Sequence, residues 1–206
     1  MKKVSRSDLL DLGAYEQIRE RYRARMIVEK KARRFALTPE LTVVFESTDT
    51  VLFQIQEMLR TERILSEPAI AHEIETYNEL VPAAGELSVT MFVEIADRET
   101  RDRRLRELSG LERAVFVEVD GVSTPAVGES RAVIEGPTTA VHYLKFPIGA
   151  AACAKIVAWS KSSTDARGRE PSPLHFVLRH PALEARVPVP LELARALAAD
   201  LAAELA

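Results

Sequence analysis

The sequence is short of several residue types, and each shortage narrows its structural class. A single cysteine, Cys153, excludes an intramolecular disulfide and any metal site built from several cysteines, so we expect a reducing compartment, the cytoplasm. The eight glycines are widely spaced, and none of the glycine-rich phosphate-binding motifs is present. Apolar residues never run long enough to span a bilayer, and the basic start is not followed by an apolar segment. We therefore expect neither membrane insertion nor a secretory signal.

The composition is that of an ordinary folded chain. Hydrophobic residues make up 47% of the 206 residues and charged residues 29%, which is enough apolar material to form a core. No segment before residue 160 has the composition of a flexible linker. We expect a single domain over residues 1–206, with a helical N-terminal part over about 1–85 and a sheet-rich part over about 86–206.

Hydrophobic periodicity predicts helices first and strands later. Three- and four-residue spacing indicates helices near residues 8–35, 50–65, 67–81, 98–108, 150–159 and 190–206. Alternating or β-branched runs indicate strands over 41–47, 86–95, 111–119, 122–127, 138–147, 174–179 and 183–189. Residues 161–173 have the composition of an exposed loop. The order of elements predicts an α+β fold, with a largely antiparallel mixed sheet, N-terminal helices and a C-terminal helix.

Charge is unevenly distributed along the chain. Residues 19–34 carry eight cations and two anions, whereas residues 57–99 carry ten anions and three cations. The simpler interpretation is that the basic helix packs beside the acidic segment within the same chain. A nucleic-acid-binding module that uses the basic helix is a second interpretation, although a pI near 5.9 makes nucleic acid an unlikely partner.

The two central predicted helices carry most of the polar side chains that could form a site. From them we select Gln54, Glu57, Arg60, Tyr77 and Asn78 as candidate ligand- or partner-binding residues. One further candidate, His142, lies on the predicted strand 138–147 and shares a face with Leu144 and Phe146, so a buried structural histidine is the alternative.

A carboxylate–histidine metal site is a more specific hypothesis for the same helices. His72 and Glu75 are three residues apart and would share one helix face, and Glu57 and Glu62 could add oxygen ligands from the preceding helix. Iron or manganese would fit such ligands. The alternative is that these side chains form a hydrated surface or pair with the arginines of the first helix. The sequence shows a single His-x-x-Glu, in the reverse of the order found in diiron bundles.

Several runs of the sequence resemble an uncharacterised bacterial family known as domain of unknown function 3501. The matching runs are residues 45–47, 49–64, 73–80, 86–88 and 141–146. Members of such a family look commonly encoded beside rubrerythrin-like diiron proteins and an iron–sulfur oxidoreductase, so the resemblance implies, by association, a cytoplasmic role in peroxide defence or electron transfer. The resemblance supplies no catalytic residues. An accessory or partner protein of that redox system, with the Gln54–Glu79 segment as its working surface, is the first hypothesis. A metal-dependent enzyme or metal-binding protein is the second.

Overall fold

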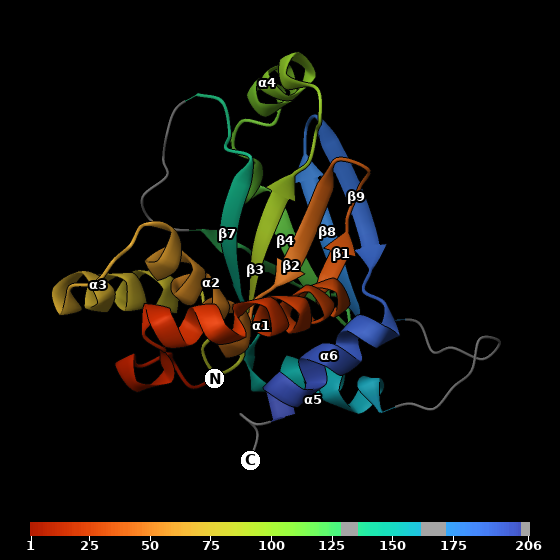
Figure 1. Ribbon diagram of the computed structural model, residues 1–206. Helices are drawn as coiled ribbons and strands as arrows, with labels where there is room; N and C mark the ends of the chain where they lie inside the picture. Colours follow the sequence, from red (N-terminus) through yellow and green to blue (C-terminus); the bar gives the residue numbers. More distant parts are fainter. Residues whose placement is uncertain (129–135, 162–171, 203–206) are drawn as a thin grey trace.

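The computed structural model describes residues 1–128, 136–161 and 172–202 (Figure 1). These residues form six α-helices, two short 3-10 helices and two antiparallel sheets. The α+β class is therefore confirmed, and the strands divide into two sheets. None of the helices in the described ranges combines the length and the apolar character that crossing a bilayer requires.

The first sheet has the strand order β1-β2-β3-β7-β6 and the second sheet the order β5-β4-β8-β9. The strands of the first sheet are β1 (Arg34–Ala36), β2 (Leu41–Phe45), β3 (Glu86–Val93), β7 (Val141–Pro147) and β6 (Val127–Gly128). Those of the second are β5 (Val122–Pro125), β4 (Val115–Val119), β8 (Leu174–His180) and β9 (Leu183–Pro188). All neighbouring strands are antiparallel, and the predicted turn at Asp120 and Gly121 joins β4 to β5.

The main hydrophobic core lies between the two sheets. Alternate residues of the longer strands β2, β3, β4, β7, β8 and β9 point inward, as the two-residue period of β structure requires. Phe176 of β8 is fully buried, and its ring contacts the rings of Phe35, Phe45 and Phe146 at centroid distances of 6.2, 5.7 and 5.6 Å. These aromatic contacts join β1, β2 and β7 of the first sheet to the second sheet.

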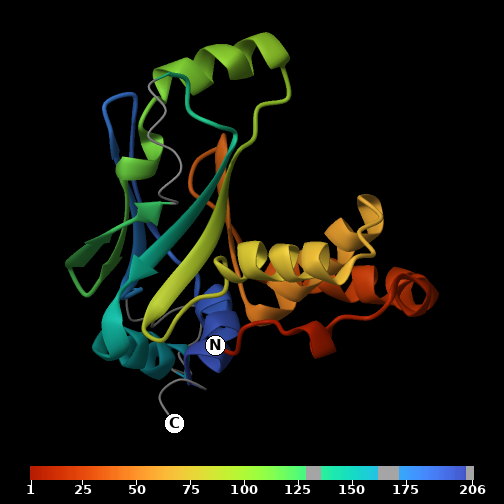
Figure 2. The ribbon, with the colours of Figure 1, turned by 90° about the vertical axis from the view of Figure 1, so that its left-hand side faces the viewer.

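The helices cover three sides of this sandwich. Helices α5 (Gly149–Ser160) and α6 (Leu191–Ala202) pack together at one end, and α4 (Arg98–Glu107) lies at the other (Figure 1). Helices α1 (Leu12–Ala32), α2 (Thr48–Thr61) and α3 (Glu67–Asn78) form an arm that extends from the outer face of the first sheet (Figure 2). The arm has its own small hydrophobic cluster, which includes Val51, Ile55 and Ile70.

The structure corrects several predicted boundaries. The first helix ends at Ala32 rather than near Phe35, because Phe35 belongs to strand β1 and pairs with Val43. Residues 111–113 form a 3-10 helix, so β4 begins at Val115, and β7 begins at Val141 instead of residue 138. Most of the predicted loop over 161–173, and the last four residues of the predicted C-terminal helix, lie outside the described residues.

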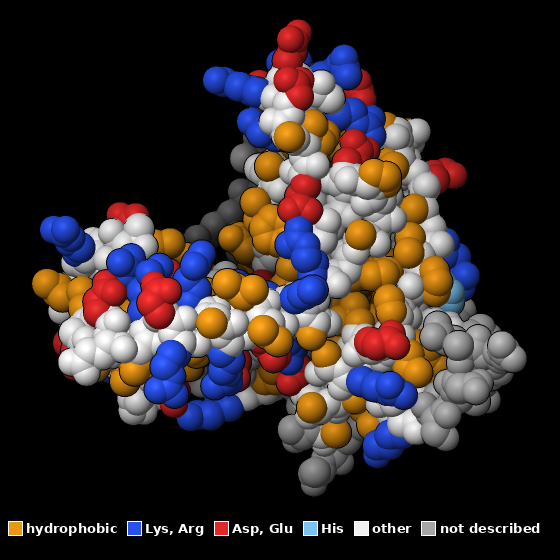
Figure 3. Space-filling model, turned by 45° about the vertical axis from the view of Figure 1, so that its right-hand side comes forward, with side chains coloured by type: hydrophobic (Ala, Val, Ile, Leu, Met, Phe, Trp, Pro, Cys, Tyr) orange, Lys and Arg blue, Asp and Glu red, His pale blue; other side chains and the backbone are white. Residues whose placement is uncertain are grey.

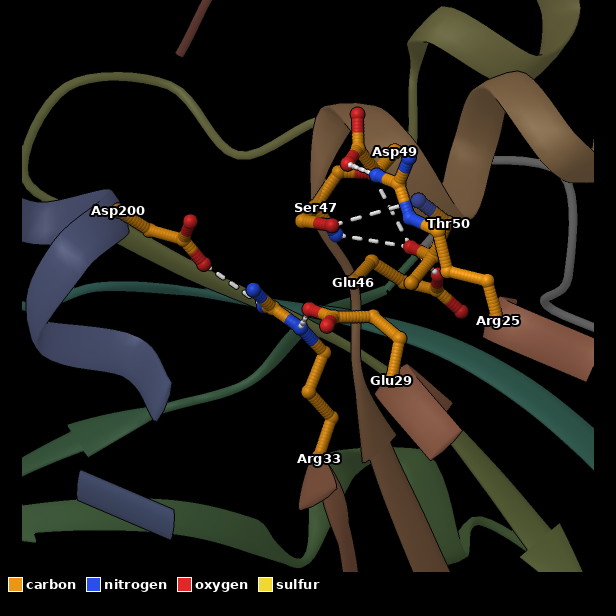
Figure 4. A network of polar contacts seen from close by, with 8 residues as sticks. All are labelled: Arg25, Glu29, Arg33, Glu46, Ser47, Asp49, Thr50 and Asp200. Carbon is orange, nitrogen blue, oxygen red and sulfur yellow. Dashed lines mark hydrogen bonds and ion pairs between the residues drawn. The ribbon is translucent and has the colours of Figure 1, made fainter. Parts of the chain in front are cut away.

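A buried arginine connects the arm to the C-terminal helix. The Arg33 side chain, only 5% exposed, donates to Glu29 on α1 at 2.6 Å and to Asp200 on α6 at 2.7 Å (Figure 4). Burial raises the pKa of the Asp200 carboxyl, and the Arg33 guanidinium opposes that rise. Because both groups are largely removed from water at this junction, the Asp200 carboxylate requires the opposite charge of Arg33 beside it.

We expect the substitution Arg33→Met to destabilise the protein by about 3 kcal/mol, because it leaves the Asp200 carboxyl buried without a counter-charge. The double variant Arg33→Met/Asp200→Leu should recover a large part of this loss, since neither charge then remains. Urea unfolding measures the stability of both variants. Equal stability of the native chain and Arg33→Met would contradict the role of Arg33 as the counter-charge of Asp200.

Candidate ligand-binding site

A cavity of about 620 Å³ lies between α1, α2 and the outer face of the first sheet. Figure 3 shows this side of the molecule, with a hollow beside the arm where lysine and arginine side chains lie next to hydrophobic ones. The cavity is lined by Arg23, Met26, Ile27, Lys30, Lys31, Arg34, Val44, Glu46, Phe53, Gln54, Thr90, Phe92, Val141 and Tyr143. Its volume lies within the usual range for small-molecule sites.

The floor of the cavity is formed around the buried carboxyl group of Glu46, which is 4% exposed. Glu46 follows β2 directly and precedes the N-cap of α2, Ser47. Its Oε1 accepts a hydrogen bond from the Thr90 hydroxyl of β3, and its Oε2 accepts from the Thr50 hydroxyl of α2. Figure 4 shows Glu46 beside Ser47 and Thr50, where the strand turns into the helix. No cation pairs with Glu46 in the described part of the chain.

Gln54 is held next to this carboxyl group in one orientation. Its Nε2 donates to Glu46 Oε2 at 3.1 Å and to the Thr50 carbonyl at 3.3 Å. Only the amino side of a carboxamide can donate, so these two contacts fix which way the amide is turned. The Gln54 Oε1 accepts no hydrogen bond from the described residues. It remains an acceptor in the cavity lining.

The side of the cavity that α1 forms is cationic. Arg23, Lys30 and Lys31 line it, and within the described ranges none of the three has a carboxylate partner. The Lys30 ammonium lies 5.6 Å from the centre of the Phe53 ring, a cation–π contact that leaves its charge available. Arg34 differs, because Glu94 pairs with it and its guanidinium lies over Phe92.

Of the predicted site residues, Gln54 is the one that lines this cavity. Glu57 instead faces α1, where it accepts from the Tyr15 hydroxyl at 2.6 Å and from Arg19 at 2.8 Å. The Arg19 contacts lower the pKa of the Glu57 carboxyl, whereas burial and Glu57 raise the pKa of Tyr15. Arg60 pairs with Glu16 of α1 at 2.6 Å. Both Glu57 and Arg60 thus hold α1 against α2.

Two further predicted residues contact other parts of the arm and the N-terminal segment. Asn78, at the end of α3, is buried and bonds to both backbone groups of Val4, each at 2.8 Å. It ties the N-terminal segment to the arm. Tyr77 is half-buried against the small hydrophobic cluster of the arm, together with Tyr143, and burial raises its pKa.

His142 lies on the opposite face of the first sheet from the cavity. It shares the inner side of β7 with the buried Leu144 and Phe146, and its Nε2 is 3.1 Å from the Thr138 hydroxyl. Burial lowers the pKa of His142, and the more distant charge of Glu112 opposes that shift.

The predicted metal ligands are not brought together. Glu57 is engaged by Tyr15 and Arg19, Glu62 is exposed at the end of α2, and His72 and Glu75 are exposed on α3. Throughout the residues that the structure describes, no group of three or more histidine, cysteine, aspartate or glutamate side chains could hold a metal ion.

Several cations of the basic segment pair within the chain. Arg19 pairs with Glu57, Arg34 with Glu94, and Arg25 with Asp49 at the start of α2. The first two contacts follow the simpler interpretation of the charge pattern. The unpaired cations at the cavity are the part of the segment that this interpretation does not cover.

Glu46, Thr90 and the lysines of the cavity were absent from the predicted site. A signal for Glu46 exists in the sequence, because this glutamate follows a mostly apolar strand and immediately precedes a helix N-cap. The strand before such a glutamate and the helix after it place its carboxyl group in the interior. Nothing local in the sequence places Thr90 or Lys30 beside it.

Because burial lowers the pKa of His142, the unfolded chain binds a proton near pH 6.5 that the folded chain binds only at lower pH. The free energy of unfolding should therefore decrease as pH falls from about 7.5 to about 5.5. The variant His142→Gln should show a smaller decrease in urea titrations across this range. His72→Gln is the control, since His72 is exposed on α3 and its replacement should leave the pH dependence as in the native chain. Identical pH dependence in the native chain and His142→Gln would contradict this assignment.

Comparisons with known proteins agree with this architecture. The model of the family described as "Protein of unknown function (DUF3501)" matches residues 3–201. A crystal structure of a novel protein of unknown function from Burkholderia pseudomallei K96243 superposes with a TM-score of 0.84 at 32% sequence identity, and the match covers 97% of this chain and 100% of that one. No curated protein matches. From the family match over nearly its whole length, the chain belongs to the DUF3501 family.

Proposed function

We propose that this protein binds a small amphipathic organic anion in the cavity beneath α1. Three cations, Arg23, Lys30 and Lys31, support this function because none has a carboxylate partner in the described chain and all line a single cavity. A carboxylate or phosphate group would supply the missing counter-charge.

The remaining walls favour an apolar body on such a ligand. Val44, Phe53, Phe92 and Val141 line the cavity together with Met26 of α1. An apolar or aromatic group placed among these side chains would leave water, which contributes roughly 25 cal/mol per Å² of buried apolar surface. A free inorganic anion would use the cations alone, so the walls favour an organic acid.

The fluorescent anion 1-anilinonaphthalene-8-sulfonate provides a direct test. We expect it to bind the native chain at one site, with an affinity that falls at high salt because exposed charges are screened. The double variant Lys30→Met/Lys31→Met should bind roughly tenfold more weakly, equivalent to about 1.4 kcal/mol. Val141→Trp should also reduce binding, because the larger side chain fills the cavity.

Lys161→Met is the matched control, since Lys161 is an exposed lysine at the end of α5, away from the cavity. It should bind the dye like the native chain. Unchanged binding in both the double lysine variant and Val141→Trp would show that the anion binds elsewhere and would contradict the proposed site.

We also propose an accessory role beside the rubrerythrin-like protein and iron–sulfur oxidoreductase that the family resemblance implies. Apolar side chains that α1 exposes among its charges support this role: Ile18, Ile27 and Val28 are 40%, 55% and 70% exposed. Such residues at the surface of the arm are suited to a protein contact.

Size-exclusion chromatography and pull-down at micromolar concentrations test this second role. We expect a complex with one of the two redox proteins that Val28→Glu weakens, because a charge would be buried in the contact. Val122→Glu is the control, since Val122 is 69% exposed on β5 of the second sheet. If neither redox protein associates with the native chain, the accessory role is wrong.

A further inference from the structure

The two polar parts of the cavity offer opposite hydrogen-bonding groups. On α1, Arg23, Lys30 and Lys31 can only donate. At the floor, the donors are already used: the Thr90 hydroxyl and one Gln54 N–H bond to Glu46, and the other Gln54 N–H bonds to the Thr50 carbonyl. What the floor still offers a ligand is therefore acceptor capacity.

Two acceptor atoms provide that capacity. Glu46 Oε1 accepts one hydrogen bond, from Thr90, and a carboxylate oxygen has room for a second. Gln54 Oε1 accepts none from the described residues. Both side chains line the cavity, and Glu46 itself is almost fully buried. A buried acceptor that a ligand covers without donating to it loses the hydration it had.

We propose that the natural ligand is an organic acid whose far end carries a hydroxyl or amino group that donates to Glu46 and Gln54. This inference rests on the proposed anion-binding function and specifies the ligand's second polar group. The acid group meets the cations of α1, the apolar body lies along Phe53 and Phe92, and the donor reaches the floor. Hydroxy acids and amino acids share this chemistry.

The change in affinity that a polar end group causes shows whether the pocket has a free acceptor. A hydroxyl added to the end of an alkyl chain lowers affinity for an apolar pocket, because the group must leave water without a partner. The hydroxyl raises affinity only where the pocket has a free hydrogen-bond acceptor within reach. A site that forms this hydrogen bond discriminates strongly against the analogue that lacks the hydroxyl.

The test is isothermal titration of the full-length chain with straight-chain acids from hexanoate to dodecanoate, each compared with its ω-hydroxy and ω-amino derivatives. The length series serves to find the chain length that spans the two polar parts of the cavity. At one length, we expect an ω-substituted acid to bind about tenfold more tightly than the unsubstituted acid, as for a hydrogen bond to a charged or strongly polar acceptor. An ω-amino preference would indicate an amino acid, and an ω-hydroxyl preference a hydroxy acid.

Two cavity variants and one control separate the floor from the rest of the site. Glu46→Gln and Gln54→Met should each reduce, several-fold, the ratio between the affinities for the ω-substituted and the unsubstituted acid of the same length. Having two variants keeps the test valid if either one does not fold. Glu118→Gln is the control, because Glu118 is a mostly buried carboxylate that pairs with Arg186 on the second sheet.

The outcomes distinguish the two proposals. If unsubstituted acids bind at least as tightly as their ω-substituted partners at every length, the inference about the donor is overturned and the anion-binding function stands. If the acids and 1-anilinonaphthalene-8-sulfonate all fail to bind, the proposed function itself is wrong. A preference that persists unchanged in Glu46→Gln and Gln54→Met would also overturn the inference.

Discussion

The position of the arm on the first sheet depends on the hydrogen bonds of the Glu46 carboxyl group. Glu46 follows β2 directly and precedes the N-cap of α2, and its carboxyl group accepts hydrogen bonds from Thr50 of the helix and Thr90 of the neighbouring strand. A buried carboxyl group requires such partners, because it has lost its hydration. The first turn of α2 is therefore fixed over the centre of the first sheet, and the space between α2 and α1 becomes a cavity.

The other contacts of the arm complete this geometry. Tyr15 and Arg19 join α1 to α2 through Glu57, and Arg33 joins the end of α1 to α6 through Asp200. With the pairs of Arg25 and Arg34, these contacts use four of the eight cations of residues 19–34. Three of the remaining cations, Arg23, Lys30 and Lys31, line the cavity between the arm and the sheet, so unpaired charge and apolar surface coincide there.

Sequence patterns predicted most elements, because each is determined by nearby residues. The alternation in β3, the β4–β5 turn and the stop of α3 before Pro82 all depend on local periodicity or local turn chemistry. Strand β1 was not predicted, because Phe35 follows a helical, cationic run. Its position in the sheet depends on packing against Phe176, which is distant in the sequence. The site was only partly predicted for the same reason: Gln54 was selected, whereas Thr90 and Lys30 come to it from distant elements.

Strand β3 connects the intersheet core to the cavity floor. Thr90 on its outer side holds the cavity floor, while Val89 and Met91 on either side of it are packed in the intersheet core. Adjacent residues of one strand cannot shift independently, and close-packed interiors transmit displacement. Interior packing and the shape of the cavity are therefore mechanically coupled: a core substitution that displaces Val89 or Met91 also displaces Thr90 and the Glu46 carboxyl group that it holds.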